Sequence, residues 1–195
     1  MSREHLRFFS QASENNRRPI EAELSRVFAD KTRILEIGSG TGQHAVYFSS
    51  ALPHLVWQTS DLQENHEGIL HWLAAQGGAN VRPPLRLDVT QHPWGVDGVD
   101  GVFTANTAHI MPWEAVVEMF VGIQEILKPK GVLVIYGPFN YGGEFTSESN
   151  KRFEQWLKDR AAHQGIRDIE KVLELATKGN LCLKEDLAMP ANNRL

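Results

Sequence analysis

The chain has 195 residues, 42% of them hydrophobic and 23% charged, with a formal net charge of -4 and a pI near 6.1. These values are ordinary for a folded globular protein and exclude a disordered chain. They also exclude a general positive field that would draw the chain to nucleic acid or to an anionic membrane. From the length we expect a single domain over residues 1–195, with no nucleic-acid partner and no membrane contact.

Cysteine and histidine usage argues against a disulfide or a metal centre. Cys182 is the only cysteine in the sequence, which excludes an intrachain disulfide and a cysteine-based metal cluster. His66 and His71 lie off a shared helical face, and no metal-ligand spacing occurs. We therefore expect no metal. A cytoplasmic location is expected, because the first twenty residues also lack the pattern of a secretory signal.

The predicted elements begin with an amino-terminal helical segment at about 1–30. Pro19 can open a helix there. The helix would bury one stripe made of Ile20, Leu24, Val27 and Phe28. The elements that follow are a strand at 33–37, a helix at 42–52 and a strand at 55–60 that ends at Asp61.

Helices and strands continue to alternate in the rest of the chain. The predicted elements are a helix around 69–73, strands at 85–87 and 100–105, a helix at 113–127, a strand at 132–136, a helix at about 147–163 and a sixth strand that can start at 181–183. Strands separated by helices of this length pair in parallel through right-handed crossovers. The expected fold class is therefore α/β, with a doubly wound, mostly parallel sheet.

The turn after the first strand contains Gly38, Gly40 and Gly42. In an open parallel sheet this turn usually lies at the ligand crevice, where glycine lets the backbone approach a ligand closely. A dinucleotide fingerprint needs glycine or alanine where this chain has Gln43, and a P-loop needs lysine there. The sequence therefore lacks a residue that each of these two phosphate-binding motifs requires. The alternative to a ligand-binding role is that the glycines only form an ordinary turn and cap a helix.

The negative charge of Glu36 distinguishes between phosphate-bearing ligands, which it would repel, and cationic ligands, which it would attract. A carboxylate about 4 Å from a pyrophosphate would be repelled by roughly 1 to 4 kcal/mol, and it would attract a cation by a similar amount. S-adenosylmethionine has no phosphate and carries a sulfonium and an ammonium. Asp61 lies 61 − 38 = 23 residues past the first glycine, where an acid accepts hydrogen bonds from ribose hydroxyls. Asp88 ends the third strand, within reach of an adenine amino group.

These residues resemble the class I S-adenosylmethionine-dependent methyltransferases, whose first motif is an acid before Gly-x-Gly-x-Gly. The resemblance is closer to a small domain-of-unknown-function family within that class, which includes a vertebrate methyltransferase-like protein. The matching stretches are "ASENNRRPI", "LEIGSGTGQHA", "NTAHIMPW", "GPFNYGGEFTSESNKRFE", "GIRD" and "MPANN". The resemblance implies a Rossmann-like class I fold and S-adenosyl-L-methionine as cofactor. The predicted cofactor-binding residues are Glu36, Gly38, Ser39, Gly40, Gly42, Gln43, Asp61, Leu62, Asp88, Val89, Asn106 and Asn16.

The sequence departs from this family in three places. Asn15 stands where arginine is usual, and Gln164 stands where tryptophan usually precedes "GIRD". Family members also continue past "MPANN" into an apolar strand, the seventh of the class I sheet. We therefore expect the last strand to be missing, or a longer native chain to have been trimmed after Leu195.

Two loops are candidates for the acceptor side. Methyl transfer mainly requires alignment and exclusion of water, so a catalytic base is not obligatory. In the loop at 106–113, Asn106 could hold the methionine part of the cofactor and His109 is a weak candidate base, with packing as its alternative. The predicted substrate residues are Met111, Trp113, Asn140 and Tyr141, for which helix anchoring and loop packing are the alternatives. Asn16 precedes the expected helix, where N-capping competes with cofactor binding.

The leading hypothesis is a methyltransferase that acts on a small-molecule acceptor, which the sequence does not identify. The alternative is a regulatory protein that binds the cofactor without turnover. A nicotinamide-dependent oxidoreductase is disfavoured, because Glu36 and Gln43 both oppose a dinucleotide.

Overall fold

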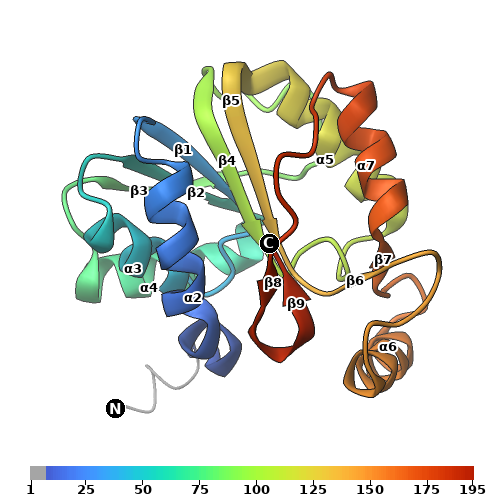
Figure 1. Ribbon diagram of the computed structural model, residues 1–195. Helices are drawn as coiled ribbons and strands as arrows, with labels where there is room; N and C mark the ends of the chain where they lie inside the picture. Colours follow the sequence, from blue (N-terminus) through green and yellow to red (C-terminus); the bar gives the residue numbers. More distant parts are fainter. Residues whose placement is uncertain (1–7) are drawn as a thin grey trace. The chain divides into compact units, whose positions relative to one another are not determined.

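The computed structural model describes residues 8–195, which form two compact units (Figure 1). Unit 1 comprises Met1–Asp88, Asp97–Thr104 and Leu127–Val134, and unit 2 comprises Val89–Val96, Ala105–Ile126 and Ile135–Leu195. Residues 1–7 of the predicted amino-terminal segment lie outside the described residues. The single domain over 1–195 stays a prediction.

Unit 1 contains most of a five-stranded sheet with the order β3-β2-β1-β4-β5 (Figure 1). Its strands are β1 (Arg33–Ile37), β2 (Val56–Asp61), β3 (Val81–Arg86), β4 (Val99–Ala105) and β5 (Leu127–Tyr136). β1 pairs in parallel with both β2 and β4, and β2 pairs in parallel with β3. This is the predicted α/β class with a mostly parallel sheet.

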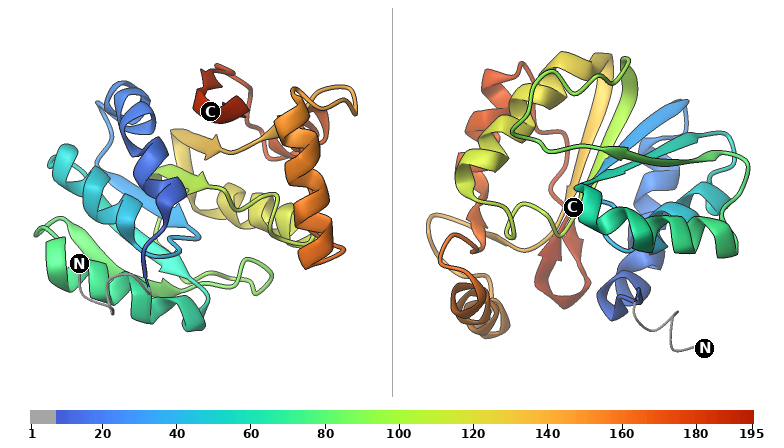
Figure 2. Two further views of the ribbon diagram at one scale, coloured as in Figure 1. Left: turned by 90° about the horizontal axis from the view of Figure 1, so that it is seen from below. Right: turned by 180° about the vertical axis from the view of Figure 1, so that it is seen from behind.

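The helices of unit 1 are α2 (Gln11–Val27), α3 (Gln43–Ala51) and α4 (His66–Gln76), with a short 3-10 turn η1 (Gln63–Asn65) before α4. α2 contacts α3 and α3 contacts α4, so the three lie side by side (Figure 2). Between helices and sheet, Phe48, Trp57 and Phe103 pack ring against ring with centroids 5.5 to 5.8 Å apart. All three are fully buried, and this aromatic cluster supports the strands that lead to the glycine turn.

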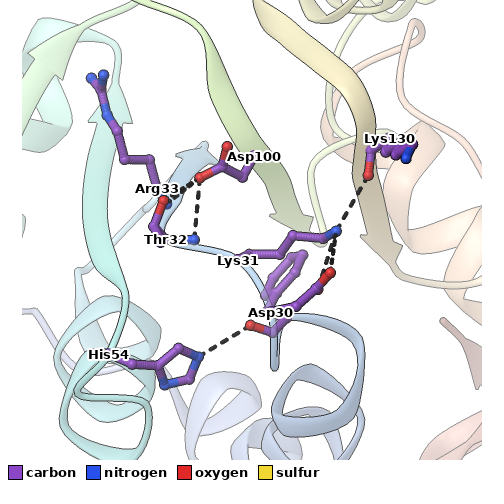
Figure 3. Close-up of polar contacts among 8 residues, drawn as sticks. Asp30, Lys31, Thr32, Arg33, His54, Asp100 and Lys130 are labelled. Carbon is purple, nitrogen blue, oxygen red and sulfur yellow. Dashed lines mark hydrogen bonds and ion pairs between the residues drawn. The ribbon is translucent and has the colours of Figure 1, made fainter.

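The amino-terminal edge of the sheet is held by the carboxylate of Asp100. It accepts hydrogen bonds from the backbone N–H groups of Thr32 and Arg33 at 3.2 and 2.9 Å and from the Thr32 hydroxyl (Figure 3). Lys128 Nζ on β5 donates to the same carboxylate at 2.9 Å. These bonds, led by that of Thr32, hold the pKa of Asp100 well below its usual range. Asp100 therefore connects β1, β4 and β5 at the end opposite the glycine turn.

Unit 2 contains α5 (Trp113–Ile126), α6 (Glu148–Arg160) and α7 (Ile169–Lys178). Its short strands are β6 (Phe139–Asn140), β7 (Arg167–Asp168), β8 (Ala188–Met189) and β9 (Asn193–Arg194), with a 3-10 turn η2 (Pro190–Asn192) between the last two. β6 and β7 pair in parallel, and β8 and β9 form an antiparallel hairpin. The hairpin is joined to the chain after β5 by a bridge between Gly137 and Arg194.

The starts of three elements differ from the sequence predictions by four residues or more. α2 begins at Gln11 rather than at Pro19, because Ser10 caps the helix through Ser13 N–H and the helix tolerates Pro19 in its interior. β3 begins at Val81 and contains two prolines, which an edge strand accommodates. β5 begins at Leu127 rather than at residue 132, so the segment between the predicted helix and the predicted strand is part of the strand.

The predicted sixth strand at 181–183 is wrong. Residues 181–187 have no regular structure, and Leu183 is 54% exposed. Apolar residues form a strand only when their backbone finds a ladder partner, and none pairs with this segment among residues 8–195. The helix α7 was not predicted from the sequence.

Within the described residues 8–195, no helix is long and apolar enough to cross a membrane.

Candidate functional site

The glycine turn after β1 has the backbone that its sequence predicts. Gly38, Gly40 and Gly42 have φ values of 71°, 57° and 89°, a region that favours glycine. A Cβ at Gly42 would lie 2.9 Å from the Cα of Ile69, so this glycine permits the close packing of α3 on α4. A Cβ at Gly40 would meet nothing within 4 Å. The backbone at Gly40 therefore faces open space.

Glu36 lies at 1% exposure beneath this turn. Its Oε2 accepts hydrogen bonds from Ser39 Oγ at 2.9 Å and from Trp57 Nε1 at 3.0 Å. Burial raises the pKa of Glu36 to about 7, against the lowering effect of these two bonds. Because the carboxylate is desolvated, it gains more from a nearby cation than an exposed carboxylate would. Trp57, its indole partner, was not predicted as a site residue.

Asp61, at the end of β2, fixes the position of the turn. Its Oδ2 accepts from Gly40 N–H at 2.7 Å, and its Oδ1 accepts from Leu62 N–H at 2.7 Å and from Asn65 Nδ2 at 2.8 Å. The carbonyl of Ser60 also accepts from the N–H groups that open the turn, those of residues 38 and 39. Sequence reasoning missed Asn65, whose side-chain hydrogen bond to Asp61 leaves no simple sequence signal.

Gln43 and Asn16 have partners within unit 1 that join α2 to α3. The side-chain amide of Gln43 bonds to the backbone of Ser10, the residue that caps α2. Asn16, which lies inside α2 rather than before it, contacts His44 Nε2 through Oδ1 at 2.7 Å. Burial lowers the pKa of His44 to about 4, so its ring is neutral near pH 7. Cofactor binding by Gln43 and Asn16 stays a prediction.

The other residues predicted to bind the cofactor lie near strand ends. Leu62 follows β2 and is 41% exposed. Asp88 and Val89 follow β3, with Asp88 half-buried and Val89 buried. Asp88 and Leu62 belong to unit 1, whereas Val89 belongs to unit 2. Unit 1 thus brings Glu36, Ser39, Gly40 and Asp61 into one hydrogen-bonded group, and contact of Leu62, Asp88 and Val89 with a cofactor stays a prediction.

In unit 2, the loop at 106–113 holds a buried and neutral histidine. His109 is 4% exposed, and the edge of its ring meets Phe153 with centroids 5.4 Å apart. Burial, aided by the charge of Arg167, lowers the pKa of His109 to about 4. No hydrogen bond to either ring nitrogen is present among residues 8–195. Asn106 opens the loop with a φ of 57°, and its N–H donates to the carbonyl of Tyr136 at 2.8 Å.

Arg167 holds the same loop from β7. Its Nε donates to Ala108 O at 2.9 Å, and its Nη2 donates to the carbonyls of Met111 and His163. Its guanidinium lies 5.9 Å from the ring centroid of Trp113. Met111 and Trp113 are therefore anchored by Arg167, a residue that sequence reasoning did not assign to the site, although it lies in the quoted "GIRD" stretch. Their contact with a substrate stays a prediction.

Asn140 and Tyr141, which follow β5, differ in how they are engaged. Asn140 is 7% exposed, and its Oδ1 is buried with no hydrogen-bond partner among residues 8–195. Tyr141 donates its hydroxyl to Asp186 Oδ2 at 2.7 Å, and Asp186 also accepts from Arg194 Nε at 2.8 Å. Burial and Asp186 raise the pKa of Tyr141 to about 12. The Tyr141 hydroxyl is thus bonded to Asp186, which precedes β8 and is itself bonded to Arg194 of β9. Among residues 8–195, no group of three or more His, Cys, Asp or Glu side chains could hold a metal ion.

Comparison with known families assigns the chain. Residues 7–195 match the family described as "Protein of unknown function (DUF938)". The chain belongs to this family. The match includes all of the residues that form the glycine turn and the 106–113 loop, so both features lie inside the DUF938 region.

Solved structures similar to this DUF938 protein include O-methyltransferases. An O-methyltransferase family protein from Burkholderia thailandensis is 15% identical, with a TM-score of 0.80 over 91% of this chain and 54% of that chain. A putative O-methyltransferase from Nostoc punctiforme is 10% identical, with a TM-score of 0.78 over 91% and 53%. NcsB1 from neocarzinostatin biosynthesis, solved with S-adenosylmethionine and 2-hydroxy-5-methyl naphthoic acid, is 13% identical, with a TM-score of 0.75 over 94% and 52%.

These similarities establish the fold of the DUF938 chain as that of the class I, S-adenosylmethionine-dependent methyltransferases. The chain spans about half the length of the solved structures that it matches. At such low identity the similarity concerns the fold alone.

Proposed function

We propose that this protein is an S-adenosyl-L-methionine-dependent methyltransferase that acts on a small-molecule acceptor. The observation that carries the proposal is the open backbone at Gly40, joined through Ser39 to the buried carboxylate of Glu36. A cytoplasmic location, expected from the single cysteine, belongs to the same proposal.

Charge favours this cofactor over a phosphate-bearing one. Glu36 is almost fully buried, so a pyrophosphate beside the turn would meet a desolvated negative group. A sulfonium or an ammonium would instead stabilise that group in its charged form. The turn also lacks the lysine of a P-loop and the third glycine of a dinucleotide site.

In this proposal, Asp61 binds the ribose of the cofactor. Its Oδ2 accepts one hydrogen bond, from Gly40 N–H. A carboxylate oxygen has two lone pairs, so Oδ2 retains acceptor capacity for a ribose hydroxyl. The backbone contact at the same time holds Gly40 in place before a ligand arrives, which reduces the entropic cost of binding.

The acceptor side of the reaction is assigned to unit 2. Met111, Trp113 and Asn140 are its proposed substrate residues, and His109 is a candidate base. NcsB1, which has the same fold, was solved in complex with S-adenosylmethionine and a naphthoic acid, and this favours a small organic acceptor. Methyl transfer would then depend mainly on alignment and on the exclusion of water.

Isothermal titration with S-adenosylhomocysteine tests the cofactor half of the proposal. We expect saturable binding to the wild type and weaker S-adenosylmethionine binding to Glu36→Gln. Glu174→Gln, which changes an exposed carboxylate on α7, serves as the matched control and should bind as the wild type does. A folded wild-type protein that binds neither compound at millimolar concentration would contradict the proposal.

Turnover needs a separate experiment. Incubation with isotope-labelled S-adenosylmethionine and a metabolite extract should transfer label to at least one small molecule. Cofactor binding without any labelled product would instead support the regulatory alternative.

A further inference from the structure

The chain just before α2, residues 8–10, packs across two helices of unit 1. The ring of Phe8 lies against α4, with its centroid 5.4 Å from that of the His71 ring. A Cβ at Gly68 would lie 3.0 Å from Phe8 Cδ1, so the absence of a side chain at Gly68 makes room for this ring. The carbonyl of Phe8 accepts a hydrogen bond from Trp72 Nε1 at 2.8 Å. We call residues 8–10 the amino-terminal strap.

The other end of the strap is bound by Gln43, the first residue of α3. Gln43 is 6% exposed, its Nε2 donates to the carbonyl of Ser10 at 3.4 Å, and its Oε1 accepts from Ser10 N–H. The Ser10 carbonyl also accepts from Glu14 N–H at 3.2 Å, within α2. The strap is therefore continuous with α2, and the glutamine amide connects it to α3.

The same amide is bonded to the glycine turn. Thr41, which lies between Gly40 and Gly42, donates its hydroxyl to Gln43 Oε1 at 3.1 Å. An amide oxygen has two lone pairs, and the bonds from Ser10 and Thr41 use both. Oε1 therefore has no acceptor capacity left for a cofactor. Its two bonds instead join the strap to the turn.

We propose that Gln43 is a positioning residue that couples docking of the amino-terminal strap to the conformation of the glycine turn. With the strap docked on α4, Gln43 and Thr41 hold residues 38–42 in the arrangement that receives the cofactor. Such pre-organisation lowers the entropic cost of binding. A ligand that favours this arrangement also stabilises the docked strap, and the two effects are equal by thermodynamic linkage. The cofactor part of this inference rests on the proposed methyltransferase function.

Three roles of Gln43 lead to different results. If the strap and the turn are coupled, removal of the Phe8 ring should loosen the turn, although the packing contacts of that ring described above are with α4. If the strap only stabilises helix packing, the turn should be unaffected. If Gln43 contacts the cofactor directly, Gln43→Met should weaken binding and Phe8→Ala should not.

Phe8→Ala and Gln43→Met are the test variants. The first removes the ring from α4, and the second removes the amide but keeps the length of the side chain. Phe8 is half-buried at the edge of unit 1, so Phe8→Ala should fold. Leu70→Ala and Gln76→Met are the matched controls, because both change exposed side chains of α4.

Amide hydrogen exchange, followed by NMR without ligand, measures the coupling itself. The N–H of Ser10 reports on the strap, and the N–H of Gly42, which donates to Ser39 O at 2.8 Å, reports on the turn. We expect both to exchange about tenfold faster in Phe8→Ala and in Gln43→Met than in the wild type. The two controls should match the wild type.

Titration with S-adenosylhomocysteine measures the link to the cofactor. Binding should slow the exchange of Ser10 N–H in the wild type by about fivefold or more. Phe8→Ala should bind more weakly, by up to the same factor, and the controls should bind as the wild type does. A strap with only a structural role would not respond to the ligand.

Faster exchange of Ser10 in Phe8→Ala with unchanged exchange of Gly42 would overturn the inference. Weaker cofactor binding by Gln43→Met but not by Phe8→Ala would also overturn it, and so would binding that leaves Ser10 exchange unchanged. Failure of the wild type to bind S-adenosylhomocysteine would defeat the proposed function. The ligand-free exchange of Gly42 in Phe8→Ala would in that case still confirm or refute the coupling.

Discussion

Asp61 holds Gly40 in place: the N–H of Gly40 donates to Asp61 Oδ2 at 2.7 Å, across the gap between the turn after β1 and the end of β2. Gly40 has no side chain to pack, so this bond helps to fix its backbone. The same carboxylate also accepts two bonds through Oδ1, from Leu62 N–H and Asn65 Nδ2. The position of Gly40 and the proposed ribose contact therefore both involve the Asp61 side chain.

Replacing Asp61 should affect stability and binding together. Asp61→Ala removes three hydrogen bonds to a carboxylate, and we expect a loss of about 2–4 kcal/mol in the free energy of unfolding. Affinity for S-adenosylhomocysteine should fall by about tenfold or more. Urea denaturation and calorimetry measure the two effects. Asp30 is an exposed carboxylate whose ion pair, within the described residues 8–195, is with Lys31, so Asp30→Ala should change neither by a comparable amount.

Glu36→Gln should stabilise the protein without cofactor above neutral pH. The folded-state pKa of Glu36 is raised from 4.5 to about 7, so its contribution is fully present below pH 4.5 and is lost as the pH rises through 7. The loss is about 3 kcal/mol. Gln keeps the shape and can accept from Trp57 and Ser39 without carrying a charge. Stability curves of the two proteins should therefore diverge as the pH rises, and parallel curves would contradict the raised pKa.

Asp100→Ala should weaken the sheet at its amino-terminal edge. The side chain accepts from Thr32, Arg33 and Lys128, and these contacts connect three strands. We expect a loss of about 1–3 kcal/mol in the free energy of unfolding. Since the folded pKa of Asp100 is lowered, its stabilisation is present above its usual pKa and is lost as the pH falls. Acid denaturation of the wild type and the variant should converge at low pH.

Gly122→Ala tests the packing of unit 2. A Cβ at Gly122 would lie 2.1 Å from Trp94 Cζ2, so the indole has to move. Overpacking of this kind costs about 1–3 kcal/mol. Thermal unfolding should show a lower midpoint for Gly122→Ala than for Gly179→Ala, which has no such contact. Equal midpoints would mean that the ring of Trp94 is free to shift.

The sequence predicts best where local pattern and tertiary environment agree. β1 was predicted with its observed bounds, because its apolar run is short, β-branched and ended by a glycine that needs a positive φ. α3 was predicted to within a residue, since Pro53 prevents its extension. The order of strands and helices followed from the same alternation.

Prediction from the sequence failed where contacts with other parts of the chain determine the local structure. Pro19 suggested a helix start, but the cap at Ser10 together with buried Asn16 extends α2 backward. The apolar residues at 181–183 suggested a strand, yet no strand pairs with them in the described part of the chain. Asn65 contacts Asp61 only four residues away, but no motif in the sequence marks this contact. Trp57 and Arg167 enter the candidate sites through contacts that are distant in sequence. No local spacing encodes such contacts.

The central claim is that the turn beside Glu36 binds a positively charged cofactor. The most direct measurement is proton release on S-adenosylmethionine binding at about pH 6, from calorimetry in buffers of different ionisation enthalpy. With a pKa of about 7, Glu36 is mostly protonated at this pH, and a cation beside it should expel the proton. The account predicts release of a large fraction of one proton by the wild type and none by Glu36→Gln. Binding with equal proton release in both proteins would contradict it.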